Sequence, residues 1–134
     1  MAKYKKKLDA DIRCPLEYGL TIFGGKSGEY PQKLYKALMN SKTVFTVWDD
    51  ARLVGLIRVL DDSEMLAQIH YVLVHPEYQG QGIAGRMVEY IKEKYKNFMY
   101  LELMPEDKNN VPFYEKHGFH VMENGAAMQI CNIN

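Results

Sequence analysis

The stretch Val72-Leu73-Val74-His75-Pro76-Glu77-Tyr78-Gln79-Gly80-Gln81-Gly82-Ile83-Ala84 decides the fold of this chain. It begins as a branched apolar strand, which Pro76 ends because proline cannot donate a hydrogen bond to a sheet ladder. From Gly82 onward apolar residues recur at three- and four-residue spacing: Ala84, Met87, Val88, Ile91 and Tyr95. Such a stripe is typical of an amphipathic helix that faces a core. The stretch therefore predicts a strand, a glycine-containing loop and a helix, in that order.

Further strand-like and helix-like segments lie on both sides of this stretch. Residues 44–48, 53–60 and 67–74 are rich in strand-forming residues and are separated by turn signals, which predicts three successive antiparallel strands. Residues 99–103 resume strand character after the helix, which implies a right-handed crossover between two parallel strands. The remaining predicted elements are a strand at 4–8, helices at 15–23, 30–39 and 110–116, and a last hairpin of 119–122 with 127–133.

The segment from Gly80 to Gly85 fits two fingerprints that are offset by one residue. Read as G-Q-G-I-A-G, it matches the dinucleotide pattern G-x-G-x-x-G, and Glu102 stands about twenty residues further on. In a dinucleotide fold the strand runs almost directly into the first glycine, whereas here residues 75–79 intervene. Dinucleotide binding is therefore only an alternative interpretation of this loop.

Read one residue earlier, as Q-G-Q-G-I-A, the same loop resembles the signature of the GNAT superfamily of acetyl-CoA-dependent N-acetyltransferases. Gln79, Gly82 and Ala84 fill the defining places of [Q/R]-x-x-G-x-[G/A], and V-H-P-E-Y precedes them as in the family. The resemblance extends to the segment N-V-P-F-Y-E-K-H-G-F at residues 110–119. It implies a single α/β domain over residues 1–134, with a mixed, mostly antiparallel sheet of six or seven strands flanked by about four helices.

The resemblance also implies acetyl-CoA as the cosubstrate, and simple physics agrees with it. Small residues let backbone amides approach a pyrophosphate, and the positive end of the following helix dipole stabilises its charge. By resemblance, backbone amides of strand residues Leu73 and Val74 contact the pantetheine and the thioester. The full set of expected acetyl-CoA contacts is Leu73, Val74, Gln79, Gly80, Gln81, Gly82, Ile83, Ala84, Asn110 and Tyr114.

Three residues are candidates for moving protons during acetyl transfer. Tyr114 stands where many family members have a tyrosine that protonates the departing thiolate, and a phenol with a pKa near 10 is protonated at neutral pH. His70 is the first candidate for the general base, since an imidazole titrates near neutrality, and the period of two puts it on the same strand face as Val72 and Val74. Glu102 on the neighbouring strand competes with His70 for this role.

Composition and charge restrict the class of partner. Seventeen basic and seventeen acidic residues cancel, so no overall field attracts nucleic acid or an anionic membrane. Cys14 and Cys131 stand far apart without metal-ligand spacing, and we expect no metal. The expected function is acetyl transfer by direct attack of a primary amine of a small molecule, in the cytoplasm, by a chain that can form a homodimer. A non-catalytic acyl-CoA-binding module is the other alternative.

Overall fold

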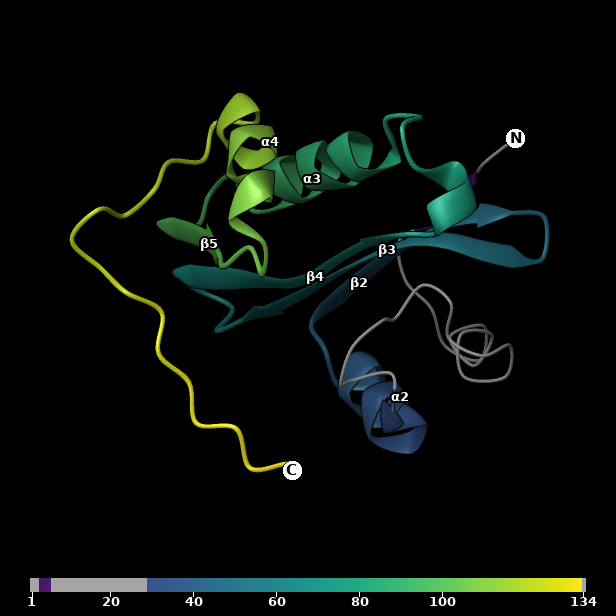
Figure 1. The fold of residues 1–134 in the computed structure, drawn as a ribbon, viewed down its shortest axis with the longest axis horizontal. Coiled ribbons are helices and arrows are strands. Elements are labelled where there is room, and N and C mark those ends of the chain that lie inside the picture. The colour runs from purple at the N-terminus through teal and green to yellow at the C-terminus, as the bar shows by residue number, and fades with distance from the viewer. Residues whose placement is uncertain (1–2, 6–28, 134) are drawn as a thin grey trace. The chain divides into compact units, whose positions relative to one another are not determined.

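The structure is a computed structural model that describes residues 3–5 and 29–133 (Figure 1). The predicted helix at residues 15–23, most of the predicted strand at 4–8, and Cys14 lie outside the described residues. Contacts divide the chain into two compact units, Met1–Leu103 and Met104–Asn134, and each unit is described by itself. No helix in the described part of the chain is both long and apolar enough to cross a membrane.

The first unit is built on a mixed sheet with the strand order β1-β2-β3-β4-β5. Its strands are β1 (Lys3–Lys5), β2 (Thr43–Asp49), β3 (Arg52–Asp61), β4 (Leu66–Val74) and β5 (Tyr100–Leu103). The first four strands pair antiparallel, and β5 pairs parallel with β4. The predicted antiparallel run and the predicted parallel crossover are both confirmed. The described residues hold five strands of this sheet, against the six or seven expected.

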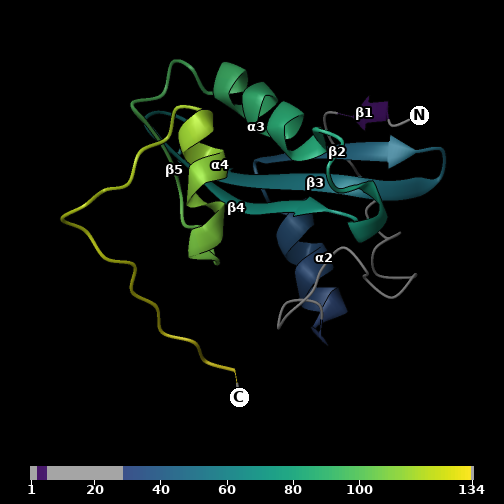
Figure 2. The same cartoon turned by 45° about the horizontal axis from the view of Figure 1, so that its top comes forward.

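Two helices cover opposite faces of the sheet, as Figures 1 and 2 show. Helix α2 (Pro31–Met39) buries Leu34 and Leu38 in an apolar cluster whose sheet members are Val44, Trp48, Leu53 and Leu56. Helix α3 (Ile83–Lys94) buries Ile83, Met87, Val88 and Ile91, as the apolar period of the sequence predicts. Burying each such side chain contributes about 1.5–3 kcal/mol to folding. This packing fixes where α3 begins.

Gly55 of β3 lets α3 approach the sheet closely. A methyl group at this position would lie 3.0 Å from Ile83 Cγ2, 3.2 Å from Val47 Cβ and 3.3 Å from Met87 Sδ. Only a residue without Cβ fits this contact without displacing its neighbours. Gly55 thereby helps to set the start of α3 against the sheet.

The second unit contains a 3-10 turn, η4 (Lys108–Asn110), and the short helix α4 (Val111–Lys116). The predicted helix at residues 110–116 is thus confirmed, but the predicted hairpin at 119–122 and 127–133 is wrong. Met122 accepts a hydrogen bond from the Gly125 N–H as in a turn, yet the flanking residues form no strand. An isolated two-stranded hairpin is at best marginally stable, and no third strand among the described residues pairs with it. These residues therefore form no strand and are largely exposed.

Candidate functional site

The glycine loop that precedes α3 is open toward solvent. Gly80 and Gly82 have φ angles of +80° and +81°, a region that residues with a Cβ rarely adopt. Apart from the adjacent residues in the chain, no atom of the described residues lies within 4 Å of a Cβ built at either position. Residues 79–82 are exposed, so the loop offers a shallow cradle of backbone with free space above it.

Helix α3 starts directly from this loop, with Gly82 as its N-cap residue. The first N–H groups of a helix have no partner within it, and they carry the positive end of the helix dipole. Gly82 brings no side chain that could cap these groups. An anion placed over the loop would therefore meet unpaired donors. Ile83 itself is buried beneath the loop, so only its backbone can face such an anion.

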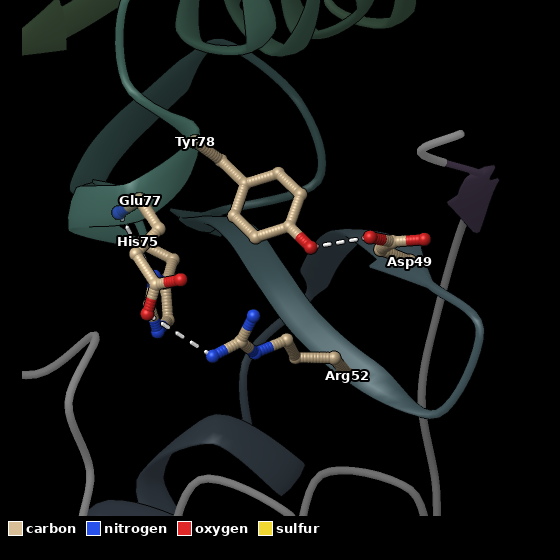
Figure 3. Close-up of polar contacts among 5 residues, drawn as sticks. All are labelled: Asp49, Arg52, His75, Glu77 and Tyr78. Atoms are coloured by element: carbon tan, nitrogen blue, oxygen red, sulfur yellow. Dashed lines mark hydrogen bonds and ion pairs between the residues drawn. The ribbon is translucent and has the colours of Figure 1, made fainter.

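Two side-chain pairs hold the turn before the loop against the β2–β3 hairpin (Figure 3). The turn is η3 (Pro76–Tyr78). The Tyr78 hydroxyl donates to the Asp49 carboxylate at the end of β2, and Arg52 Nη2 lies 3.2 Å from Glu77 Oε2. The Arg52 guanidinium also lies 5.7 Å from the centre of the Tyr78 ring. The hairpin thus anchors the entry of the glycine loop.

Hydrogen bonding in this anchor moves two pKa values apart. The hydrogen bond from Tyr78 lowers the pKa of Asp49, and the same bond raises the pKa of Tyr78. Asp49 is therefore ionised and Tyr78 protonated at neutral pH, which is the state that the hydrogen bond requires.

His75 is part of the same turn and is buried. Its backbone N–H donates to the Val54 carbonyl of β3 at 2.7 Å, and its Nδ1 accepts from the Glu77 N–H at 3.1 Å. His75 therefore caps the turn and has a structural role. Gln79 comes directly after the turn, and its side-chain amide donates a hydrogen bond to the Val74 carbonyl at 3.2 Å.

Strand β4 has an open edge beside the loop. The β4–β5 ladder runs only from the pair Leu66–Tyr100 to the pair Ile69–Leu103, so residues 70–74 of β4 have no β5 partner. The N–H and C=O of one residue in an antiparallel strand point to the same side. Because His75 bonds to β3, alternation directs the polar groups of Val74 toward the open edge and those of Leu73 toward β3. Of the two predicted thioester contacts, this geometry favours the Val74 amide.

A β-bulge at His70 lies where the ladder with β5 ends. Arg58 pairs with Tyr71 and Val59 pairs with Ile69, which leaves His70 as the extra residue. The expectation that His70 shares a face with Val72 and Val74 is wrong, because the bulge breaks the alternation. Val74 pairs with Gly55, whose face packs on α3, whereas Tyr71 and Leu73 pack against the α2 cluster. His70 points to the α2 side, where its Nδ1 lies 2.7 Å from Arg58 Nη1.

This contact occupies one ring nitrogen of His70. A guanidinium can only donate, so Nδ1 accepts from Arg58. In this arrangement the Nδ1 lone pair is already used, and it cannot at the same time accept a proton from an attacking amine.

Glu102 lies on the same face of the sheet as His70. It pairs with Gln68, two residues before His70 on the neighbouring strand, and it is half-buried. The sheet therefore brings both candidate bases to the end of the β4–β5 ladder, at the start of the open edge. No group of three or more His, Cys, Asp or Glu side chains that could hold a metal ion occurs among the residues the structure describes.

Tyr114 and Asn110 belong to the second unit. Tyr114 is half-buried on α4 with its ring edge-on to Phe113 and Phe119, and burial raises the pKa of its phenol. Asn110 ends η4, and its N–H donates to the Asp107 carbonyl at 2.9 Å. The second unit is described by itself, so the contacts of both residues with acetyl-CoA stay predictions.

Sequence reasoning missed Asp49, Arg52, Arg58 and Ser41. Asp49 and Tyr78 are 29 positions apart in the sequence, and Arg52 and Glu77 are 25 positions apart. No local sequence pattern predicts contacts over such distances. A lone arginine inside the apolar run L-V-G-L-I-R-V-L was the one visible signal for Arg58.

Comparison with known proteins agrees with this geometry. The family model described as "Acetyltransferase (GNAT) family" matches residues 16–119. An uncharacterized N-acetyltransferase of Bacillus methanolicus is 32% identical over 75 residues, which cover 56% of this chain and 59% of that protein. The chain spans between 50% and 59% of the length of the curated relatives that it matches.

Solved structures show the same fold. A probable acetyltransferase of unknown function from meticillin-resistant Staphylococcus aureus has a TM-score of 0.79 at 26% identity, covering 98% of this chain and 99% of that one. A GNAT family acetyltransferase from Elizabethkingia anophelis, solved with acetyl-CoA bound, has a TM-score of 0.67 at 18% identity, covering 90% and 77%. At the second identity the likeness concerns the fold alone.

Proposed function

This chain belongs to the GNAT acetyltransferase family, and on that premise we propose that it transfers an acetyl group from acetyl-CoA to the primary amine of a small molecule. The observation that carries the proposal is the open glycine loop at the start of α3, next to the unpaired edge of β4. The loop would supply donors for a pyrophosphate, and the edge would supply donors for a thioester carbonyl. The relative from Elizabethkingia anophelis that binds acetyl-CoA supports the choice of cosubstrate.

Acetyl-CoA fits the residues that are present. Free space above Gly80 and Gly82 leaves room for phosphates, and the backbone of residues 79–84 would hold them. Bound there, acetyl-CoA would supply an activated acetyl group and a thiolate leaving group.

The backbone and side chains of this chain would then stabilise charge and move protons. The Val74 N–H would stabilise negative charge on the carbonyl oxygen during attack by the amine. Glu102 would take the proton of the attacking amine, since the Nδ1 lone pair of His70 is already used while Arg58 donates to it. The protonated phenol of Tyr114 would give its proton to the thiolate.

Replacement of a loop glycine tests the cosubstrate. We expect Gly82→Asp to abolish measurable acetyl-CoA binding in isothermal titration calorimetry, because the carboxylate occupies the cradle, repels phosphate and strains a residue with φ of +81°. Gly125→Asp is the matched control, since Gly125 is exposed and its φ is not positive. Unchanged affinity in Gly82→Asp would contradict the assignment.

Turnover tests the reaction class. We expect release of free CoA from acetyl-CoA in the presence of a panel of primary amines. Tight acetyl-CoA binding with no thiol release across the panel would instead identify a non-catalytic acyl-CoA-binding module.

A further inference from the structure

Arg58 is a half-buried cation in the middle of β3. Its Nε donates to the Ser41 hydroxyl at 2.7 Å, and its Nη1 donates to His70 Nδ1 at 2.7 Å. Its guanidinium lies 5.7 Å from the centre of the Tyr71 ring. Ser41 is itself buried and donates to the Ala37 carbonyl at the end of α2. These contacts hold the guanidinium in one place.

None of these partners is a carboxylate. Among the described residues no carboxylate lies within ion-pair distance of Arg58, whereas Arg52 on the same strand pairs with Glu77. A guanidinium has five N–H groups, and the two hydrogen bonds leave three for another partner. Burial lowers the pKa of Arg58, and no described carboxylate offsets that cost. A fixed, partly desolvated cation that pairs with no carboxylate of the described residues is suited to bind an anion from outside the chain.

The position of Arg58 relates this cation to acetyl transfer. Arg58 lies opposite Tyr71, beside the bulge at His70 where the ladder with β5 ends. Tyr71 precedes Val74 by three residues, which is roughly 10 Å along a strand. A small molecule whose amine reaches the open edge of β4 could therefore also reach Arg58.

We propose that Arg58, held by Ser41, His70 and Tyr71, is the subsite that binds a carboxylate of the acceptor, so that the preferred acceptors are amino acids. The inference rests on the proposed function and specifies its substrate class. A single guanidinium carries one positive charge, which balances the one negative charge of a carboxylate. Two of its N–H groups can donate parallel hydrogen bonds to the two carboxylate oxygens. A phosphate carries about −1.5 to −2 charges at pH 7 and would leave part of its charge unmatched.

Matched acceptor pairs test this inference without any mutation. We would measure thiol release with glycine, β-alanine, 4-aminobutyrate and 6-aminohexanoate, each against its own carboxamide. For at least one spacing we expect kcat/KM to favour the acid by about 10- to 100-fold, the range expected for charge-assisted hydrogen bonds. A ratio near one for every pair would overturn the carboxylate subsite, even if all amines are acetylated.

Substitutions of Arg58 test whether this residue causes the acid-to-amide ratio of kcat/KM. We expect Arg58→Gln to bring the acid-to-amide ratio to about one, and Arg58→Lys to keep only part of it, because an ammonium lacks the planar fork. Lys33→Gln removes one positive charge from the exposed face of α2 and should leave the ratio unchanged. The ratio compares two acceptors on one variant, so a general loss of activity does not change it. A full ratio in folded Arg58→Gln would contradict the assignment.

A binding measurement separates this inference from the proposed function. N-acetyl-β-alanine and its carboxamide would be titrated into the protein, with binding followed by calorimetry. Without acetylation of any amine the proposed function fails, yet tighter binding of the acid to wild type than to Arg58→Gln, by tenfold or more, would still support the anion subsite. Equal binding of acid and amide to the wild-type protein would reject it.

Discussion

At the residue scale, one hydrogen bond decides which proton carrier the site can use. An imidazole is a common general base, but the Arg58 guanidinium donates to His70 Nδ1 and so occupies the lone pair of that nitrogen. Glu102 on the adjacent strand reaches the same face of the sheet. The difference between these two residues lies in their neighbours, because a side chain's chemistry depends on what donates to it.

The pH dependence of kcat/KM should distinguish these two bases. We expect the acid limb of the profile to disappear in Glu102→Gln and to persist in His70→Gln. The acid limb arises because the general base must be deprotonated to act, so only removal of the base abolishes it. Stopped assays with saturating acetyl-CoA would measure both profiles. Loss of the limb in His70→Gln alone would assign the base to His70 and require that Arg58 moves.

Tyr114 should act as a proton donor over the whole neutral range. Burial raises the pKa of its phenol above the ordinary value of 10, so the donor is present below the raised pKa and lost only as pH rises through it. We expect no basic limb in kcat that is due to Tyr114 below about pH 10. Tyr114→Phe should lower kcat by about 100-fold and change acetyl-CoA affinity far less.

Tyr100→Phe is the matched control for this substitution, because Tyr100 is an exposed tyrosine on β5. Its kcat should equal that of the wild-type protein. Equal turnover of Tyr114→Phe and the wild-type protein would remove the proton-donor role.

At the element scale, Tyr95 at the end of α3 connects the helix to two strands. Its hydroxyl lies 2.7 Å from Thr43 Oγ1 on β2 and donates to Asp61 Oδ2 at the end of β3 at 2.6 Å. Burial and the Asp61 carboxylate raise the pKa of Tyr95 to about 12. The helix that starts at the glycine loop is thus tied to the sheet at its other end.

The contribution of the Tyr95 hydrogen bonds to the free energy of unfolding should depend on pH above neutrality. Below about pH 10 the phenol is protonated in both states, and between about 10 and 12 it ionises first in the unfolded chain, so the contribution of Tyr95 falls as pH rises. Tyr95→Phe should lose about 1–2 kcal/mol at pH 7, and that difference from wild type should shrink toward pH 12. Urea titrations would measure it, with Tyr100→Phe as the control. A constant difference across this range would contradict the prediction.

At the scale of the whole molecule, ligand binding should distinguish the family function from dinucleotide binding. A ligand that binds only the native state raises its stability by about 2.7 kcal/mol at 100 times its Kd. We expect acetyl-CoA to raise Tm in a concentration-dependent way, and NAD to leave it unchanged at the same concentrations. Stabilisation by NAD alone would contradict the proposal. The antiparallel pairing of β2, β3 and β4 already departs from the parallel sheet of a dinucleotide fold.

The elements whose signals are local follow from the amino-acid sequence alone. The strand at 67–74, the stop at Pro76, the loop with Gly80 and Gly82, and the helix that follows all stand where residue period and turn chemistry predict them. The parallel crossover from β4 to β5 also follows from element order and length. These features depend on neighbours close in the chain, which a sequence displays directly.

The contacts between distant segments depend on how the folded chain is arranged, and the sequence alone does not reveal them. Strict alternation misplaced His70, because the bulge depends on how β3 and β4 pair and not on β4 alone. The predicted hairpin after residue 118 has suitable residues but lacks a third strand, since strand formation depends on a partner as much as on propensity. Asp49 with Tyr78, and Arg58 with His70, meet only after the sheet has formed, so the electrostatics of the site could not be read from sequence spacing.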